Sequence, residues 1–282
     1  MSKALNILVT GGEGQLAQAL NKVSGKNESC IFVTKNELDI TNGEALESFF
    51  EEHTPHVVIN TAAYTQVDAS ETYTETAFRV NETAVKNLVN VCEKHEVKLI
   101  HISTDYVFDG TASEPYRETD PTNPVTVYGK SKRAGELVIQ NSTLKAYAIV
   151  RTSWLYSPYG HNFYKTMLRL AQSKKELSVV NDQKGSPTNA LHLAEALLVI
   201  AHTLHPENAG IYHYCNEGET TWYNFAKAIF EKHKLQLEVT PVTSEEYPTA
   251  ARRPGYSVLD TEKIKKTFSL KIADWHTALK TL

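Results

Sequence analysis

The sequence contains little cysteine and no long apolar run. Its three cysteines, Cys30, Cys92 and Cys215, are widely separated and form no Cys-x-x-Cys pair. This spacing predicts neither a disulfide framework nor a zinc site. No stretch reaches the roughly 18 apolar residues that a membrane-spanning helix needs, and the opening MSKALNILVTGG lacks the features of a signal peptide. We therefore expect a cytoplasmic protein that does not bind membranes.

An excess of charge of one sign is also missing. The formal net charge is −4 over 282 residues, and acidic and basic residues are interspersed without long blocks. General nucleic-acid binders are usually basic, so nucleic acid is not an expected partner. The eleven histidines never occur at the His-x-x-x-His spacing of a helical metal site. A chain of this length buries a sufficient core without metals, and we expect no metal site.

Short apolar runs alternate with amphipathic helical patterns in the first half of the chain. The predicted strands cover residues 4–10, 30–34, 56–60, 97–103 and 145–151. The predicted helices cover residues 15–23, 44–53 and 74–96, and another begins near Tyr128. Continuous apolar strands between helices indicate a parallel sheet covered on both faces. The predicted fold class is therefore α/β, with a Rossmann-type doubly wound parallel sheet.

Beyond residue 155 this regularity weakens, and prolines and aromatic residues become more frequent. We interpret this half as a smaller C-terminal α/β substrate-binding region, from which one helix near residues 191–204 returns to the first domain. The predicted division is an NADP-binding Rossmann domain of residues 1–155 together with 186–208, and a substrate-binding region of residues 156–185 and 209–282.

A glycine-rich turn, TGGEGQLA at residues 10–17, follows the first predicted strand and opens a helix. Gly11 and Gly14 permit a tight turn and a close backbone approach to a pyrophosphate, which the free N–H groups of the helix start can bind. Ala17 occupies the third small position. A turn that only reverses the chain is the alternative, but the flanking strand and helix favour a dinucleotide site. Gly11, Gly14, Gln15 and Leu16 are candidate cofactor contacts.

The end of the second strand bears on the choice of cofactor. Sites that prefer NAD usually carry a carboxylate there, which accepts from the ribose hydroxyls. This chain has Thr34 and Lys35 instead, and Lys35 can meet a 2′-phosphate. We therefore favour NADP(H), with NAD(H) as a second possibility; the alternative is that Lys35 is a solvated loop lysine. Asp39 and Ile40 follow closely and are candidates for the border of the adenine site.

Tyr128 and Lys132 are four residues apart in YGKSK, which places both on one face of a helix. The lysine ammonium is expected to lower the tyrosine pKa from about 10 towards neutrality. Such a tyrosine can protonate a carbonyl oxygen as hydride reaches the carbon. Ser103 and Thr104, at the end of a predicted strand, can donate hydrogen bonds to the same carbonyl. A surface helix pair is the alternative for Tyr128 and Lys132 alone, and the combination with the strand end argues against it.

Together these motifs resemble a known family. The segments TGGEGQLA, NTAAYTQVD, STDYVFDG, YGKSK, RTSW, NDQKGSPT and ARRPGYSVLD are similar to those of the extended short-chain dehydrogenase/reductases, and within them to the dTDP-4-dehydrorhamnose reductase family. The resemblance covers nearly the whole chain. It implies reduction of the 4-keto group of dTDP-4-dehydro-L-rhamnose to dTDP-L-rhamnose with NADPH or NADH. This is the last step of dTDP-rhamnose biosynthesis, which supplies cell-wall polysaccharide.

The resemblance also implies roles for individual residues. Tyr128 is the expected general acid, Lys132 its partner and Thr104 a donor to the carbonyl. The expected cofactor-binding set also includes Ala62, Ala63, Tyr64 and Ser103, together with Tyr128 and Lys132 themselves. The expected substrate-binding residues are Val67, Thr104, Asp105, Tyr106, Trp154 and Arg253. Arg252 is the alternative to Arg253 as the partner of the substrate pyrophosphate, because either guanidinium suits a phosphate.

One departure from the family concerns magnesium. Some members dimerise around a magnesium ion held by glutamates, and the positions that match those glutamates are Ala19 and Leu191 here. Neither side chain can bind a hard cation. We therefore expect no magnesium site, and both a monomer and a homodimer stay open.

Three rival functions share parts of this sequence pattern. A nucleotide-sugar 4,6-dehydratase of the same superfamily has Thr-Asp-Glu at the strand end, whereas this chain has Thr104, Asp105 and Tyr106. Without that glutamate, elimination lacks its base. A nucleotide-sugar 4-epimerase stays open on this evidence. The third rival is a non-catalytic regulatory subunit of the methionine adenosyltransferase type, which the intact Thr104, Tyr128 and Lys132 disfavour.

Overall fold

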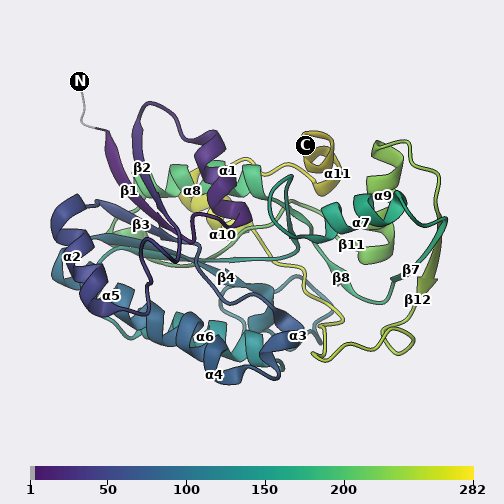
Figure 1. The fold of residues 1–282 in the computed structure, drawn as a ribbon, viewed down its shortest axis with the longest axis horizontal. Coiled ribbons are helices and arrows are strands. Elements are labelled where there is room, and N and C mark those ends of the chain that lie inside the picture. Colours follow the sequence, from purple (N-terminus) through teal and green to yellow (C-terminus); the bar gives the residue numbers. More distant parts are fainter. Residues whose placement is uncertain (1–3) are drawn as a thin grey trace.

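The computed structural model describes residues 4–282, and a parallel sheet of six strands forms its centre (Figure 1). In spatial order the strands are β10 (Gly210–His213), β5 (Tyr147–Thr152), β4 (Lys98–Thr104), β3 (Val57–Asn60), β1 (Leu5–Thr10) and β2 (Glu28–Val33). Because β1 leads to β2 on one side and β3 lies on its other side, the strand order reverses between β1 and β3. In open α/β sheets, ligands bind at the carboxyl edge beside such a reversal.

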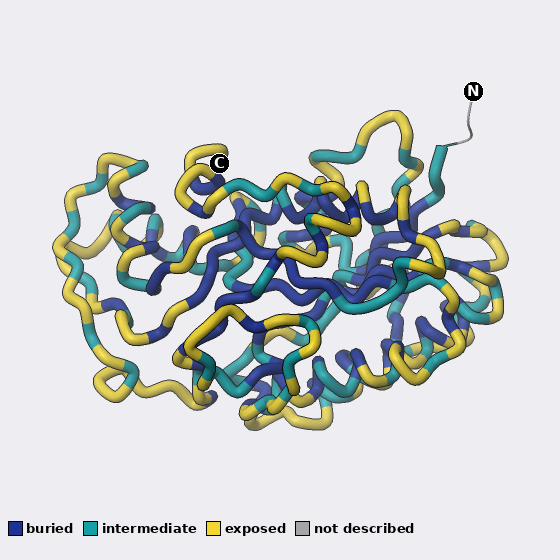
Figure 2. Tube along the Cα trace, turned by 180° about the vertical axis from the view of Figure 1, so that it is seen from behind, coloured by how far each residue is buried: buried dark blue, intermediate teal, exposed yellow. Residues whose placement is uncertain are grey.

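Helices cover both faces of this sheet (Figure 1). One face carries α1 (Gln15–Val23), α8 (Ala190–Thr203) and α10 (Glu262–Phe268); the other carries α2 (Gly43–His53), α5 (Ala84–Lys94) and α6 (Val127–Gln140). Alternate residues of β1 enter different cores, since Ile7 and Val9 pack with α1 and α8 whereas Leu8 packs with α2 and α5. The buried chain runs through these central strands, and exposed residues gather in the peripheral loops (Figure 2). The predicted doubly wound fold is confirmed.

The predicted helix over residues 74–96 is interrupted. It consists of α4 (Thr74–Phe78), a π-helical turn (Arg79–Thr83) and α5, and it follows the short α3 (Val67–Ser70). Inside the turn, the Asn81 side chain exchanges hydrogen bonds with the backbone of Tyr64 and donates to the Ser131 hydroxyl of α6 at 2.9 Å. An added Cβ at Gly135 would lie 2.2 Å from the Asn81 carbonyl oxygen. The turn therefore lies where α6 crosses unusually close.

The rest of the chain forms a smaller α/β region. Its helices are α7 (Phe163–Ala171), α9 (Trp222–Lys232) and α11 (Trp275–Lys280), which share a core with Tyr156. Its short strands pair as β6 (Leu155–Tyr156) with β9 (Thr188–Asn189), β7 (Glu176–Val180) with β12 (Glu238–Val242), and β8 (Lys184–Gly185) with β11 (Thr220–Thr221). Two 3-10 turns lie at Asp105–Val107 and Pro206–Asn208. None of the helices found over residues 4–282 has the length and apolarity needed to cross a membrane.

Strand β10 lies within residues 209–282, which were assigned to the substrate-binding region, yet it extends the central sheet. Gly210 to His213 pair in parallel with Ala148 to Arg151 of β5. Helix α10, further along, packs on the same core as α8. The boundary predicted at residue 208 therefore misplaces this strand, because its GIYH sequence is short and lacks a continuous apolar run. The remaining division into two regions stays a prediction.

Candidate active site

A cavity of about 1020 Å³ opens at the carboxyl edge of the sheet. Its wall is built from the segments that follow β1, β2, β3, β4 and β5, together with the start of α6. The cavity thereby brings together residues from distant parts of the sequence: Gly11, Gly14, Lys35, Ala62, Thr104, Tyr128, Lys132 and Trp154.

The glycine turn forms one wall of the cavity. Gly11 has a φ of +72°, and an added Cβ would lie 2.9 Å from the Cα of Ala62, so this position requires glycine. Gly14 is the N-cap of α1, and within residues 4–282 no side chain caps this helix or places a carboxylate in its first turn. The first N–H groups of α1 are therefore available to an anion.

Gln15 and Leu16 also border the cavity, but their side chains are already engaged. The Gln15 Nε2 atom donates to the carbonyl of Leu155 at 3.3 Å. Its Oε1 atom accepts from Ser157 and Asn162, both at 3.1 Å. Leu16 is buried in the core beneath α1. The Gln15 side chain therefore joins the glycine turn to the C-terminal region, and both residues present mainly backbone to a ligand.

The far end of the cavity is cationic. Lys35 is exposed there, and Arg79 at the start of the π-helical turn joins it in lining the wall. The Asp39 carboxylate between them accepts from the Thr41 N–H at 2.9 Å and the Thr41 hydroxyl at 2.8 Å. These bonds, with the charges of Lys35 and Arg79, hold the pKa of Asp39 below its ordinary value. No sequence pattern marked Arg79.

These features fit a dinucleotide. The open helix start suits a pyrophosphate, and two cations suit a 2′-phosphate. Ile40, Ala62 and Ala63 provide an apolar lining between them, and Tyr64 lies next to Ala63. The Asp39 carboxylate is occupied by Thr41, which leaves it less suited to receive ribose hydroxyls.

Tyr128 and Thr104 meet in the middle of the cavity. Thr126 caps α6 by accepting from the Gly129 N–H at 3.0 Å, which fixes the turn that carries Tyr128. The Tyr128 ring packs edge-on against Tyr106 with centroids 5.5 Å apart. Burial raises the pKa of the Tyr128 phenol above its ordinary value, and the Thr104 hydroxyl offsets only part of this. The predicted lowering of this pKa by Lys132 is therefore wrong for the structure.

The surroundings of Lys132 explain that difference. The Nζ atom donates to the carbonyl of Ile102 at 2.7 Å and lies 3.3 Å from Nε2 of His101. The other ring nitrogen of His101 lies 3.0 Å from the Asn60 amide, which in turn accepts from the Thr10 hydroxyl at 2.7 Å. Burial lowers the pKa of Lys132 to about 8, against a partial opposing effect of Glu136. The ammonium is thus anchored to the sheet.

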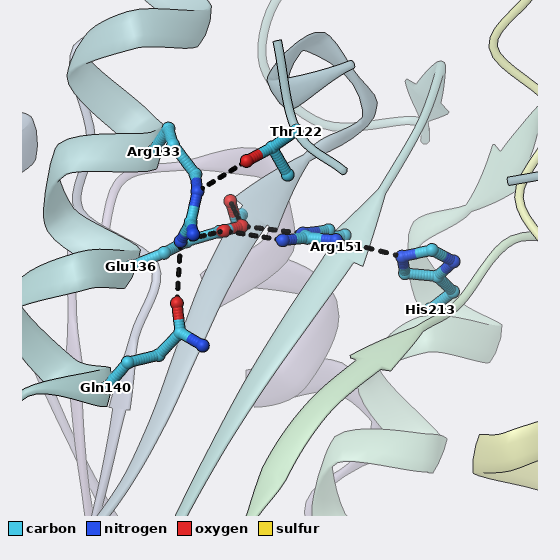
Figure 3. Close-up of polar contacts among 7 residues, drawn as sticks. Thr122, Arg133, Glu136, Gln140, Arg151 and His213 are labelled. Carbon is cyan, nitrogen blue, oxygen red and sulfur yellow. Dashed lines mark hydrogen bonds and ion pairs between the residues drawn. The ribbon is translucent and has the colours of Figure 1, made fainter. Parts of the chain in front are cut away.

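Glu136 and Arg151 lie at the centre of a buried ionic network (Figure 3), and this network also includes Ser103. Its hydroxyl donates to Oε1 of Glu136 at 2.6 Å, so it is not free to donate to a substrate carbonyl as predicted. Glu136 also binds Arg151 and Arg133, at 2.7 and 3.2 Å to its Oε2 atom. Arg151 reaches His213, whose pKa is lowered to about 3 by burial and by the arginine charge. Sequence reasoning missed this network.

The predicted substrate side of the cavity contains a second polar group of residues. Thr104 donates to Oδ1 of Asp105 at 2.9 Å, whereas Oδ2 is buried without a hydrogen-bond partner in the described part of the chain. Burial raises the pKa of Asp105 to about 6. Arg253 donates to the Tyr106 hydroxyl at 3.0 Å and to Asp68 at 2.7 Å. Arg252 is exposed, so Arg253 is the inward residue of the pair. Val67 and Trp154 also line the cavity, and their contact with the sugar stays a prediction.

Comparison with known proteins shows which family has this sequence and fold. Residues 5–282 match the family described as RmlD substrate binding domain. A dTDP-4-dehydrorhamnose reductase from Aggregatibacter actinomycetemcomitans is 42% identical over 98% of this chain and 97% of its own. The chain belongs to the dTDP-4-dehydrorhamnose reductase family. The predicted resemblance is thus confirmed over nearly the whole length.

Solved structures of dTDP-4-dehydrorhamnose reductases share the fold. The enzyme from Bacillus anthracis, in complex with NADP, has a TM-score of 0.95 and 37% identity, covering 99% of this chain and 98% of its own. The enzyme from Clostridium acetobutylicum has a TM-score of 0.93 and 41% identity, covering 98% of each chain.

Ala19 and Leu191 are the residues expected at the positions where some family members carry magnesium-binding glutamates. Ala19 is fully buried in the core, and Leu191 packs against the same core. Over residues 4–282, no three His, Cys, Asp or Glu side chains gather in a cluster that would hold a metal ion.

Proposed function

We propose that this chain reduces the 4-keto group of dTDP-4-dehydro-L-rhamnose to give dTDP-L-rhamnose, with NADPH as the hydride donor. The observation that carries the proposal is the meeting of Thr104, Tyr128 and Lys132 beside the glycine turn in one cavity. Membership in the dTDP-4-dehydrorhamnose reductase family supports the choice of substrate. We infer that the reaction takes place in the cytoplasm and supplies rhamnose for cell-wall polysaccharide.

NADPH, when bound, supplies a hydride to the carbonyl carbon of the substrate. The N–H groups of Gln15 and Leu16, which follow the turn of Gly11 and Gly14, are proposed to bind its pyrophosphate, and Lys35 with Arg79 its 2′-phosphate. Asp39, Ile40, Ala62, Ala63 and Tyr64 are proposed to border the cofactor. Ser103 contributes through position only, because its hydroxyl is held by Glu136.

Tyr128 is proposed to donate its proton to the substrate O4 atom. Its raised pKa keeps the phenol protonated at neutral pH, which is the form a general acid requires. Thr104 is proposed to turn its hydroxyl from Asp105 towards the same oxygen and stabilise the developing negative charge. Water is proposed to return the proton to Tyr128 afterwards, and the Lys132 ammonium, held by the carbonyl of Ile102, is proposed to bind the ribose hydroxyls of the cofactor.

The substrate is proposed to occupy the side of the cavity lined by Val67, Tyr106 and Trp154. Arg253 is proposed to bind the pyrophosphate, since its guanidinium is already held at this side by Tyr106 and Asp68. Asp105 offers a buried carboxylate oxygen to a sugar hydroxyl.

The proposal is tested by mixing purified protein with NADPH and dTDP-4-dehydro-L-rhamnose, then following NADPH absorbance and the identity of the sugar product. We expect one NADPH to be oxidised for each dTDP-L-rhamnose formed. Conversion of the sugar without net oxidation would indicate an epimerase. Cofactor binding without any conversion would favour another keto-sugar substrate or a regulatory role.

A further inference from the structure

Two tryptophans from distant segments form a stacked pair at the cavity. The rings of Trp154 and Trp222 are parallel to within 8°, with centroids 3.5 Å apart. Trp154 follows β5, whereas Trp222 is the first residue of α9 in the C-terminal region. Both are half-buried and both line the cavity. The stack thus joins the sheet edge to the smaller region at the ligand site.

Contacts with the segment around Gly185 and Thr188 hold Trp154 in this position. Its φ of +46° is a left-handed conformation that L-residues rarely adopt. Its carbonyl accepts from the Thr188 N–H at 3.2 Å. An added Cβ on Gly185 would lie 2.5 Å from the Cε2 atom of the Trp154 indole. Any side chain at Gly185 would therefore displace the indole, and strain of this kind is often retained where function requires it.

Trp222 is equally constrained. The preceding residue, Thr221, caps α9 and donates its hydroxyl to Asn181 at 2.7 Å. Thr220 pairs with Gly185 in the antiparallel β8–β11 ladder. The same ladder therefore holds both Gly185, which packs against Trp154, and the residues that lead into α9. Phe163 packs against the Trp222 ring with centroids 4.6 Å apart. The second indole cannot move without disturbing these contacts.

The stack lies beside the reacting centre and not at the cofactor's cationic end. Thr152, two residues before Trp154, pairs in register with Thr104 of β4. Lys35 and Arg79 belong to the opposite side, near β2 and the π-helical turn. The part of a nucleotide sugar that lies nearest the reacting carbonyl is the sugar ring. The indoles therefore form the wall that the sugar, and not the nucleotide base, would contact.

We propose that Trp222 is a specificity-determining residue which, with Trp154, forms an apolar wall for the methyl group and C–H face of a 6-deoxy sugar. This inference rests on the proposed function. A methyl group packed on an indole loses only water contacts, whereas a hydroxymethyl group there buries a hydroxyl against an apolar surface without a partner. The wall accordingly selects 6-deoxyhexoses over hexoses that retain the C6 hydroxyl.

The test compares dissociation constants of dTDP, dTDP-L-rhamnose, dTDP-glucose and NADPH for the whole protein and four variants. Trp222→Ala removes the outer indole, Trp222→Phe keeps an aromatic ring, and Gly185→Ala displaces Trp154 from beneath. Tyr223→Ala is the matched control, since Tyr223 adjoins Trp222 but lies outside the cavity wall and packs with Lys227. Near-UV circular dichroism verifies that each variant is folded and reports the coupled tryptophans.

We expect Trp222→Ala and Gly185→Ala each to raise the dissociation constant of dTDP-L-rhamnose about tenfold. This is the effect of leaving a few tens of square ångströms of apolar surface exposed to water. Binding of dTDP and NADPH should change less than twofold, and the preference over dTDP-glucose should shrink. The dissociation constant of dTDP-L-rhamnose for Trp222→Phe should lie between those of Trp222→Ala and the wild type, and that for Tyr223→Ala should equal the wild-type value. Unchanged dTDP-L-rhamnose binding in both variants, or an equal loss for dTDP, overturns the proposal. These constants need no turnover, so failure of the reductase assay in the wild type is a separate result.

Discussion

The carboxylate of Glu136 and the guanidinium of Arg151 form a two-point ion pair inside the protein, with Oε1–Nε and Oε2–Nη2 distances of 2.8 and 2.7 Å. Both side chains are almost completely shielded from solvent. The pair connects α6, which carries Tyr128 and Lys132, to β5 (Figure 3). The Ser103 hydroxyl extends the connection to β4. Helix α6 is thereby fixed against the sheet by charge as well as by packing.

Replacement of Glu136 by alanine should destabilise the fold strongly. It leaves the buried Arg151 guanidinium without its anion, a change that typically costs about 3–5 kcal/mol of unfolding free energy. Urea unfolding measures this loss. The exposed pair of Lys145 with Glu96 is the control, because Lys145→Ala should leave the stability almost unchanged. Equal losses of unfolding free energy in the two variants would show that the buried pair contributes no more to stability than the exposed one.

Local patterns predicted several of the residues that the structure brings together in the cavity. The spacing of Tyr128 and Lys132 predicted one helix face, and the structure places both in the cavity. The glycine turn was also predicted correctly, because its strand, turn and helix are adjacent in sequence. Helix α1 occupies the predicted residues 15–23.

Local sequence patterns could not predict contacts between segments that are distant in the sequence. Glu136 lies one turn beyond Lys132 on the same face, yet nothing in the sequence showed that Ser103 and Arg151 would meet it. The direction of the Tyr128 pKa shift was missed for the same reason, since it depends on burial. Trp222 and Arg79 reach the cavity through tertiary packing alone, so no local motif marked them.

Tyr128→Phe should reduce kcat by about 10²- to 10⁴-fold if the phenol is the general acid. The variant retains the ring that packs against Tyr106, so folding and NADPH binding should be preserved. Single-turnover oxidation of NADPH with the keto sugar is the measurement. Tyr73→Phe, which alters an exposed tyrosine, serves as the control. A Tyr128→Phe enzyme with nearly normal kcat would refute the assigned role.

The reaction should slow at alkaline pH through Lys132. Its pKa in the fold is lowered to about 8, so the ammonium loses its proton as pH rises through that value. The raised pKa of Tyr128 keeps the phenol from ionising in the same range. The kcat/KM profile of the wild type should therefore fall above about pH 8. A flat profile up to pH 10 would mean that the charge of Lys132 is not needed.

Preference for NADPH should depend on two cations, one of them not marked by the sequence. Lys35→Ala and Arg79→Ala should each weaken NADPH binding about tenfold, because a charge-assisted contact to the 2′-phosphate is lost. NADH lacks that phosphate, so its dissociation constant should change little. Fluorescence titration of both cofactors measures the difference, with the exposed Lys86→Ala as control. Equal losses for NADPH and NADH would contradict a 2′-phosphate site at these residues.

Arg253 and Arg252 offer a matched pair for locating the pyrophosphate of the substrate. Arg253 is half-buried and held by Tyr106 and Asp68, whereas its neighbour Arg252 is exposed. Arg253→Ala should raise KM for the nucleotide sugar about 10- to 100-fold, since a guanidinium–phosphate contact is typically worth about 1.5–3 kcal/mol. Arg252→Ala should leave KM unchanged, and neither variant should alter NADPH binding. Arg253→Lys should restore part of the loss, because it keeps the charge but not the two-pronged donor geometry. If the two alanine variants raise KM equally, the inward orientation of Arg253 does not determine pyrophosphate binding, and the contact with Asp68 is then only structural.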